Sequence, residues 1–401
     1  MPLSVPAVSD VECSTAIDSA NDSLLRRGDI GAGKYHVRLQ VGRFFGRWFA
    51  PRERYNLTMR TYLSSGDVFL GHQPLGEHSE KPERLKAILD AIDASDLVGR
   101  FRWIPPRPAT TEELLRVHTE TYLQDLRQKM GDLHPKGKGW LDPDTYYGPG
   151  TYDAAFHAAG TATELALKIA SGREEPGDNG FALVRPPGHH AGPSRAMGFC
   201  LFNNVAIAAQ AVRATGRRVA IVDFDVHHGN GTEQIFRADG GVLFISLHQF
   251  PFYPDTGDAA SIGEGNGQGF IVNIPLPEGS GGAEYKLAFR RLVLPALRRF
   301  APDLILVSAG FDGHSRDSLA GMALMEDDYA AMVSQLLSVQ SRLLLVLEGG
   351  YHREALAASV LAVLRVLIDP SGYRPTGHDA GTKARDSVRK LISDLQQLHR
   401  L

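Results

Sequence analysis

Residues 218–231 decide the fold, and they read Arg218-Val-Ala-Ile-Val222-Asp223-Phe-Asp225-Val-His227-His-Gly-Asn230-Gly231. The apolar run at the start predicts a strand buried on both faces, which is typical of a parallel sheet covered by helices. Side chains alternate across a strand, so Asp223, Asp225 and His227 are expected on one face at its end. Carboxylate oxygen and imidazole nitrogen together suit a zinc-like divalent cation. The stretch therefore predicts a metal site, and a charged strand end with satisfied histidines is the alternative.

The rest of the chain repeats this alternation. From Leu63 onward, apolar runs alternate with helical patterns, which predicts a single α/β domain with an open parallel sheet and helices on both faces. Strands are expected at 59–63, 180–184, 218–224, 242–247, 303–308 and 342–347. Helices are expected at 83–94, 154–171, 205–215, 283–300, 327–339 and 353–367. We assign the domain to 61–370, an N-terminal extension of uncertain structure to 1–60, and a C-terminal helical tail to 371–401.

Composition limits the partners. The 401 residues carry a formal net charge of −3, so charge predicts neither a nucleic-acid nor a membrane partner. With only two cysteines, a disulfide framework and an all-cysteine zinc site are excluded, and any metal must be held by His, Asp or Glu. The chain shows neither an apolar run of about 18 residues nor a signal-peptide pattern. We therefore expect a cytoplasmic protein.

The N-terminal extension has its own pattern. Residues 34–54 interleave basic side chains with Phe44, Phe45, Trp48 and Phe49. This pattern is compatible with a membrane-surface or partner-binding segment, but we favour an appendage that packs on the domain or stays loose. Because Met59 opens the first predicted strand, we also consider it as the translation start, which the N-terminal mass of native protein would decide.

Polar groups flanked by glycine follow four further predicted strands. They are Arg185-Pro-Pro-Gly-His189-His190-Ala191, His248, Ala309-Gly-Phe-Asp312-Gly-His314 and Glu348-Gly-Gly-Tyr351. In open α/β sheets, ligands bind beyond the carboxyl ends of the strands, where glycines let the backbone turn sharply. These groups and the Asp225/His227 pair are therefore expected to form one site.

A zinc ion held by three protein groups keeps a fourth position for water and lowers the pKa of that water. Asp225 and His227 need one more carboxylate. We choose Asp312, because it follows a buried strand in a Gly-Phe-Asp-Gly turn, whereas Asp317 comes five residues later in a loop expected to face solvent.

His189 and His190 suit general base and general acid work, because an imidazole exchanges protons near neutral pH. Asp223 and Asn230 are the available groups to orient them. Tyr351 brings a phenol that can donate a hydrogen bond to a carbonyl oxygen as negative charge develops. Since the chain offers no cysteine or credible serine nucleophile, these residues predict direct, metal-assisted hydrolysis of a carbonyl compound.

Five ordered motifs resemble the zinc-dependent histone deacetylase family, which includes acetylpolyamine amidohydrolases. They are His78-Ser-Glu-Lys-Pro-Glu-Arg-Leu85, Arg185-Pro-Pro-Gly-His-His-Ala191, Gly198-Phe-Cys-Leu-Phe-Asn-Asn204, Asp223-Phe-Asp-Val-His-His-Gly-Asn230 and Glu348-Gly-Gly-Tyr351. The resemblance implies one zinc ion on Asp225, His227 and Asp312, proton transfer by His189 and His190, and carbonyl polarisation by Tyr351.

The resemblance also implies a K+ site and a substrate tunnel. The K+ site would lie near Asp223, with the Asp225 and His227 carbonyls, Ser246 and Leu247. The acyl-lysine tunnel would be walled by Gly198, Phe199 and Tyr253.

Three positions refine the resemblance. Asn230 is similar to the class II branch and its bacterial relatives, and Ser318 stands where the family usually has proline. Leu319 stands where polyamine-selective members of the class II branch carry an acid, so we expect acyl-lysine in proteins or peptides as the substrate. Acetylpolyamines stay the alternative, because other polyamine hydrolases achieve selectivity through dimer loops, and a homo-oligomer stays open.

Two rival functions are less well supported. Arginases share this fold but need extra carboxylates for a second manganese ion, and Gly229 and His314 occupy those positions here. A catalytically silent binding module is disfavoured because every chemical group is present. The sequence therefore predicts a zinc-dependent amidohydrolase.

Overall fold

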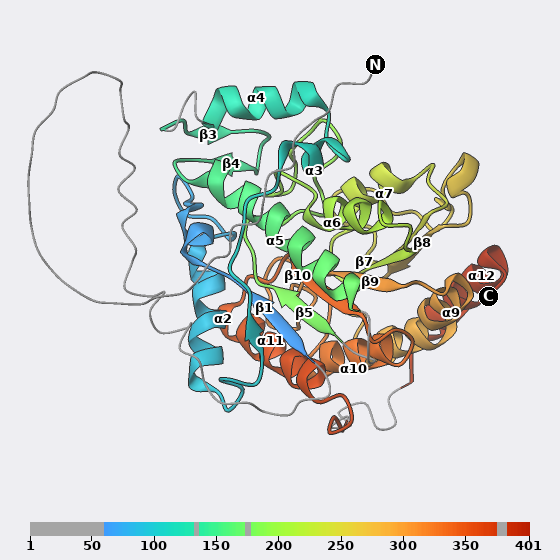
Figure 1. Cartoon of the computed structure of the whole chain (residues 1–401). Helices are drawn as coiled ribbons and strands as arrows, with labels where there is room; N and C mark the ends of the chain where they lie inside the picture. The colour runs from blue at the N-terminus through green and yellow to red at the C-terminus, as the bar shows by residue number, and fades with distance from the viewer. Residues whose placement is uncertain (1–59, 132–135, 173–177, 375–382) are drawn as a thin grey trace, which may run out of the picture. The chain divides into compact units, whose positions relative to one another are not determined.

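The computed structural model describes residues 60–131, 136–172, 178–374 and 383–401, so the predictions for 1–59, including Met59 as a start, lie outside the described residues. An eight-stranded sheet has the order β2-β1-β5-β10-β9-β6-β7-β8, and all paired neighbours are parallel (Figure 1). Its strands are β1 (Thr61–Ser64), β2 (Arg102–Trp103), β5 (Asn179–Ala182), β6 (Val219–Asp223), β7 (Val242–Gln249), β8 (Ile271–Leu276), β9 (Leu304–Ala309) and β10 (Leu343–Leu347). The predicted open parallel α/β fold is confirmed.

Helices cover both faces of the sheet (Figure 1). The helices α5 (Thr151–Ser171) and α6 (Asn204–Arg213) pack together on one face, and α2 (Pro82–Ala94), α10 (Glu326–Leu337) and α11 (Arg353–Ile368) pack on the other. The remaining helical segments are η1 (Asp67–Gly71), α3 (Thr111–Leu115), α4 (Glu120–Met130), α7 (Asn230–Phe236), η2 (Gly265–Gly267), α8 (Gly282–Ala288), η3 (Phe289–Val293), α9 (Leu294–Phe300) and α12 (Asp386–His399). A small antiparallel pair is formed by β3 (Gly139–Trp140) and β4 (Tyr146–Tyr147).

The central strands explain why apolar runs in the sequence predicted their positions. Every residue of β6, β9 and β10 is buried, because helices cover both faces of these strands. A continuous apolar run is the sequence pattern that such an environment selects. The same burial forces the chain to place its polar groups after the strand ends.

The prediction omitted the short strands β2, β3 and β4 and the helices α3, α4 and α7, and it also differs at two larger elements. The edge strand β8 was missed, because its sequence Ile-Val-Asn-Ile-Pro-Leu is interrupted by Asn273 and by Pro275, which an edge position tolerates. The helix predicted at 283–300 is divided into α8, a π-helical turn η3 and α9. Its apolar period continues through the π turn, so periodicity alone did not reveal the division.

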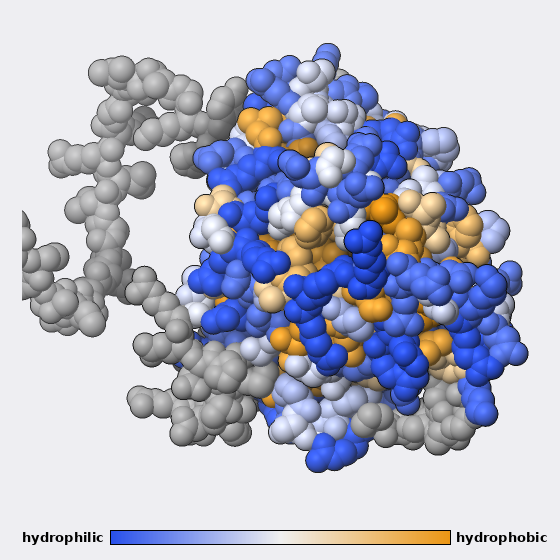
Figure 2. All heavy atoms as spheres, turned by 90° about the vertical axis from the view of Figure 1, so that its right-hand side faces the viewer, coloured by the Kyte–Doolittle hydropathy of each residue, from blue (hydrophilic) through white to orange (hydrophobic). Residues whose placement is uncertain are grey.

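Within the described ranges, no helix is both long enough and apolar enough to cross a membrane. Figure 2 shows the face that lies on the right of Figure 1, where polar residues cover most of the surface and separate small apolar patches. The helix α12 falls within the predicted tail 371–401 and buries Val388, Ile392 and Leu395. This part of the tail therefore packs on the domain.

Candidate metal centre and active site

The predicted site residues gather where four adjacent strands end. The strands β5, β10, β9 and β6 are neighbours in the sheet, and Asp223 at the end of β6 is in register with Ser308 on β9 and Ser246 on β7. Since all strands are parallel, their carboxyl ends lie along one edge. The sheet thereby brings together segments that are more than 100 residues apart in sequence.

Three side chains that could hold a metal ion converge beyond β6 and β9. One ligand atom each from Asp225, His227 and Asp312 lies within 4.8 Å of the other two. His227 Nδ1 is 3.1 Å from Asp225 Oδ1 and 3.3 Å from Asp312 Oδ2. Both carboxylates are buried and His227 is 13% exposed, so His227 is the most accessible member of the group.

The chemistry of this group fits a divalent cation. Asp312 Oδ2 is buried and accepts no hydrogen bond, which is costly for a carboxylate oxygen. Burial, reinforced by the neighbouring Asp225, raises the pKa of Asp312 to about 6. A bound cation would compensate both negative charges. A Cβ at Gly310 would collide with Asp225, and one at Gly349 with Asp312, so glycine leaves room for the two carboxylates.

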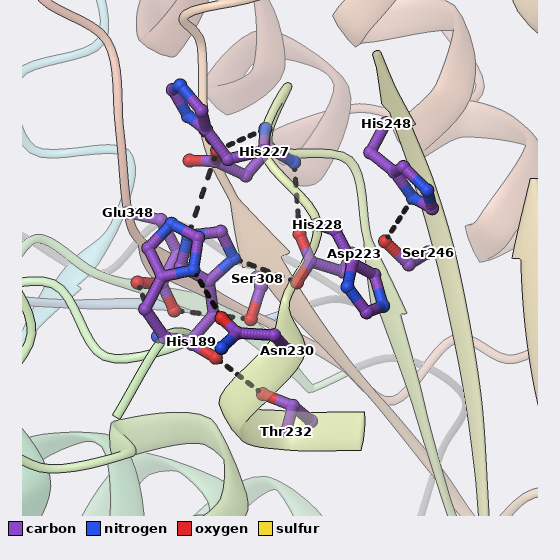
Figure 3. A network of polar contacts seen from close by, with 12 residues as sticks. His189, Asp223, His227, His228, Asn230, Thr232, Ser246, His248, Ser308 and Glu348 are labelled. Atoms are coloured by element: carbon purple, nitrogen blue, oxygen red, sulfur yellow. Dashed lines mark hydrogen bonds and ion pairs between the residues drawn. The ribbon is translucent and has the colours of Figure 1, made fainter. Parts of the chain in front are cut away.

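Two histidines from the loop after β5 lie next to this group, and their rings are 4.0 Å apart. His189 Nδ1 is 3.0 Å from Asp223 Oδ2, and His190 Nδ1 is 2.7 Å from Asn230 Oδ1 (Figure 3). His189 Nε2 lies 3.7 Å from Asp225 Oδ1. Each ring therefore has one nitrogen held by a side-chain oxygen, which fixes its orientation and leaves the other nitrogen for the site.

The two imidazoles differ in charge preference. Burial opposes the positive charge of His189, but Asp225 and Asp223 outweigh it and raise its pKa to about 10. Burial also disfavours the charge of His190, and the neighbouring His189 lowers its pKa further, well below the usual 6.5. These opposed shifts favour a protonated His189 and a neutral His190, so the pair offers one candidate acid and one candidate base.

The buried carboxylate of Glu348 holds the loop that carries His189 and His190. From the sequence, Glu348 was predicted only as a polar group after a strand. Glu348 Oε2 accepts hydrogen bonds from the amides of Gly188 (2.6 Å) and His189 (3.2 Å). Glu348 Oε1 accepts one from Ser308 Oγ (Figure 3). Burial raises the pKa of Glu348 to about 7. Its position directly after β10 was the available signal for this role.

Tyr351 follows on the same loop and is half-buried. Burial raises the pKa of its phenol well above the usual 10, so the hydroxyl keeps its proton. The Arg84 guanidinium lies over the ring, with Cζ 4.8 Å from the centroid, and donates to the carbonyl oxygens of Gly350 (2.5 Å) and Glu348 (2.6 Å). Arg84, on α2, was missed as a contributor to the site.

Asp317 requires a correction. The expectation that its loop faces solvent is wrong for this side chain, which is only 6% exposed. Its Oδ2 accepts hydrogen bonds from the amides of Tyr351 (2.6 Å) and His352 (3.0 Å), and its Oδ1 accepts one from Leu319 N (3.0 Å). Asp317 therefore binds backbone, and it is not part of the group formed by Asp225, His227 and Asp312.

Aromatic rings surround the centre. The Tyr253 ring lies 5.4 Å from His190 and 6.0 Å from His227, and Phe199 lies 6.0 Å from Tyr351. Phe252, which the sequence did not single out, stacks on His227 at 5.3 Å. A Cβ at Gly198, whose φ is +57°, would collide with the His190 ring, so this position must stay small.

The aromatic wall continues outward through residues that were not predicted as lining. The His78 ring lies 4.7 Å from Phe199 and 6.2 Å from Trp140, which is 52% exposed. Tyr146 completes this chain of rings at 4.8 Å from His78. A row of ring contacts therefore links the exposed Trp140 through His78 and Phe199 to Tyr351.

The structure also shows the environments of the remaining residues that the sequence analysis singled out. Ser246 and Leu247, predicted for K+, are fully buried on β7, and Ser246 Oγ lies 2.9 Å from His248 Nδ1 (Figure 3). Leu319 is half-buried on the loop held by Asp317. His314, at an arginase-specific position, has Nε2 3.4 Å from Glu326 and lies outside the group that could hold a metal.

Next to the candidate metal centre, a second buried cluster connects the segment of residues 69–84 to the loop that carries His189 and His190. Glu80 Oε1 and Oε2 accept from Arg185 Nε (2.5 Å) and Nη2 (2.6 Å), and Arg84 and Tyr146 donate to the same carboxylate. Although burial opposes the charge of Glu80, Arg185 lowers its pKa well below the usual 4.5. We refer to Glu80, Arg84, Arg185, Tyr146 and the adjacent His72 as the Glu80 cluster.

Comparison with known proteins identifies the class. The sequence pattern of the histone deacetylase domain matches residues 78–367. The chain is 41% identical over 330 residues to a histone deacetylase-like amidohydrolase of Pseudomonas aeruginosa, which covers 80% of this chain and 82% of that protein. The chain belongs to the histone deacetylase family, and the predicted resemblance is confirmed.

Further relatives agree with this membership. A probable deacetylase of Archaeoglobus fulgidus is 36% identical over 362 residues, covering 85% of this chain and 98% of the relative. Histone deacetylase 15 of Arabidopsis thaliana is 41% identical over 298 residues, covering 73% of this chain and 53% of the relative. A crystal structure of the HDA15 HD domain superposes with a TM-score of 0.77 at 37% identity and covers 85% of this chain and 94% of that chain. The protein is thus a hydrolase of the histone deacetylase family.

Proposed function

We propose that this hydrolase uses zinc to remove acetyl or other acyl groups from Nε-acyl-lysine in proteins or peptides. One observation carries the proposal: the ligand atoms of Asp225, His227 and Asp312 lie within 4.8 Å of one another, and His189 Nε2 is 3.7 Å from Asp225. The proposed metal ligands and the proposed proton-transfer group His189 therefore lie close together, which supports the proposal. Family membership supports the same reaction class.

Asp225, His227 and Asp312 would hold one zinc ion. When bound, such an ion supplies a Lewis acid that polarises the acyl carbonyl and lowers the pKa of a coordinated water. For K+, we propose the Asp223 side chain, the Asp225 and His227 carbonyls, Ser246 and Leu247. Asp223 also accepts from His189 and from the Asp225 amide, so a cation beside it would act on the orientation of both residues.

The residues then share the chemistry of amide hydrolysis. His189 and His190 take a proton from the attacking water and return one to the departing nitrogen, so that the carbon–nitrogen bond breaks and the product leaves as an amine. Tyr351 keeps its proton and donates a hydrogen bond to the acyl oxygen as negative charge develops there. Glu348 fixes the backbone of the histidine loop, and Arg84 fixes the carbonyls that precede Tyr351.

The aromatic wall supports an acyl-lysine substrate. The rings of Phe199 and Tyr253 stand around His190 and Tyr351 and match the methylene stem of lysine, which packs on apolar surface. Leu319 offers no charge to a secondary ammonium, so an acetylpolyamine gains no ion pair from this residue. Cytoplasmic location and assembly state stay predictions.

The decisive experiment is a side-by-side kinetic comparison on the zinc-loaded protein. Acetyl-lysine peptides, longer acyl-lysine peptides and acetylpolyamines should be ranked by kcat/KM, and we expect an acyl-lysine peptide to rank first. A preference for acetylpolyamines would replace the lysine proposal with a polyamine amidohydrolase. Hydrolysis of none of these amides would reject the proposed function.

The charge at position 319 gives a sharper test of substrate choice. Leu319→Glu should raise the ratio of acetylspermidine to peptide kcat/KM by about fivefold or more, since a poorly solvated carboxylate near a cation contributes on the order of 1 to 3 kcal/mol. Ser318→Glu places the same charge at the neighbouring, exposed position and is the matched control. Equal changes in the two variants would mean that Leu319 does not face the substrate.

A further inference from the structure

Asp317 lies in the loop after β9 and bonds to the backbone of the loop after β10. One oxygen, Oδ2, accepts from the consecutive amides of Tyr351 (2.6 Å) and His352 (3.0 Å). The other oxygen accepts from Leu319 N within its own loop. With 6% exposure, this carboxylate is largely shielded from water, so its three hydrogen bonds are charge-assisted and strong.

The position of these bonds matters because they fall on the amide of Tyr351 itself and on that of the next residue. Its loop turns at Gly350, whose φ is +114°, and a Cβ there would lie 2.9 Å from Leu356 Cδ1. Arg84 holds the carbonyl oxygens before Tyr351, and Asp317 holds the amide of Tyr351 itself. The backbone on both sides of the phenol is thus fixed by two charged groups from different elements.

Capping of α11 does not account for Asp317. The helix begins at Arg353, and its N-cap residue His352 already accepts the amide of Ala355 through its own side chain. Asp317 instead binds the two amides that precede the helix. A carboxylate buried at this point acts on the segment that carries the phenol.

We propose that Asp317 is a positioning residue for Tyr351: it couples the loop after β9 to the loop after β10 and holds the phenol where it can donate to the acyl oxygen. The proposal rests on the proposed function, because it assigns Asp317 to the reaction through Tyr351. It also gives a role to Asp317, which the sequence analysis weighed against Asp312 as the third metal ligand.

A double-mutant cycle tests this coupling. Asp317→Ala should lower kcat by about 10- to 100-fold with little change in KM and with zinc retained, because the phenol loses its fixed position. In a Tyr351→Phe background, the same Asp317→Ala change should alter kcat by less than about twofold, since no hydroxyl is left to position. Asp317→Asn should restore part of the activity, because its amide oxygen can still accept the two N–H groups.

Two further measurements keep the test independent of folding and of turnover. Glu284→Ala is the matched control: Glu284 is a carboxylate with 7% exposure that also accepts backbone amides, from Gly281 and Arg385, but on α8. It should leave kcat unchanged. Amide hydrogen exchange in the peptide containing Tyr351 and His352 should accelerate in Asp317→Ala and stay unchanged in Glu284→Ala.

The outcomes separate the two proposals. Additive effects of Asp317→Ala and Tyr351→Phe, or unchanged exchange at Tyr351, would overturn the positioning role while leaving a working deacetylase. Zinc loss in Asp317→Ala would overturn it in favour of a metal-linked role. If the unaltered protein hydrolyses no acyl amide, the proposed function fails, and the exchange measurement still decides whether Asp317 restrains the Tyr351 backbone.

Discussion

Two buried polar clusters stand beside each other at the carboxyl edge of the sheet, and they are balanced in opposite ways. In the Glu80 cluster, one carboxylate meets two arginines and a tyrosine hydroxyl, so both of its oxygens accept hydrogen bonds. In the candidate metal centre, Asp225 and Asp312 share the His227 imidazole, His189 Nε2 lies 3.7 Å from Asp225, and Asp312 Oδ2 accepts no hydrogen bond.

The difference separates a scaffold from a site. Compensated buried charges are stable only with all partners present, so the Glu80 cluster fixes the loops around it. In the candidate metal centre, Asp312 is the carboxylate that lacks full compensation, because its Oδ2 accepts no hydrogen bond and Asp225 lies beside it, and a bound cation would supply the missing positive charge. Opposite directions of pKa shift express this contrast: the pKa of Asp312 is raised, mainly by burial, and that of Glu80 is lowered by Arg185.

Removing a carboxylate from the centre should have the largest effect. Asp225→Ala or Asp312→Ala should reduce zinc from about one ion per chain to almost none and abolish turnover, because two ligands cannot retain the ion. Zinc content by elemental analysis checks this result. Asp317→Ala should keep its zinc, and zinc loss in that variant alone would overturn the choice of Asp312.

The same position tests the charge balance directly. In chelator-treated protein, Asp312→Asn should raise the unfolding temperature, because it removes one of two repelling buried carboxylates. In zinc-loaded samples the order should reverse, since the native protein gains binding free energy that the variant lacks. A lower unfolding temperature for Asp312→Asn under both conditions would show that the centre is already compensated.

Breaking the Glu80 cluster should lower stability by an amount that does not depend on zinc. Glu80→Gln should lower the free energy of unfolding by about 3 to 5 kcal/mol with or without zinc, because it leaves buried arginines without their counterion. Urea unfolding measures the change. The exposed ion pair between Asp96 and Arg365 provides the control, and Asp96→Asn should leave stability nearly unchanged because water screens that pair. A zinc-dependent loss in Glu80→Gln would mean that the clusters are not separate.

The smallest effect is expected from the phenol that lies between the clusters. Tyr351→Phe should lower kcat by about 10²-fold, because one hydrogen bond to the developing oxyanion is lost, while zinc content and stability stay close to those of the native protein. Steady-state kinetics and elemental analysis are sufficient. Activity near the native level would show that the hydroxyl does not reach the acyl oxygen.

The sequence by itself determined the parallel sheet and the chemistry at its edge. Strands buried on both faces appear as continuous apolar runs, so β6, β9 and β10 were predictable from local pattern. Parallel strands align their carboxyl ends, and Asp225, His227 and Asp312 could therefore be grouped from their positions after strands in the sequence. The edge strand β8 and the π turn at Phe289–Val293 carry no comparable local signal.

Only the tertiary structure decided what the remaining charged groups do. Asp317 was expected to face solvent because it lies in a loop five residues after Asp312, yet its partners Tyr351 and His352 lie more than 30 residues away. Glu80 and Arg185 are 105 residues apart, and Arg84 meets the loop of Tyr351 across more than 260 residues. Residue type and local spacing report how strongly a group can interact, but its partner is set by which strands are neighbours, and that is a property of the whole sheet.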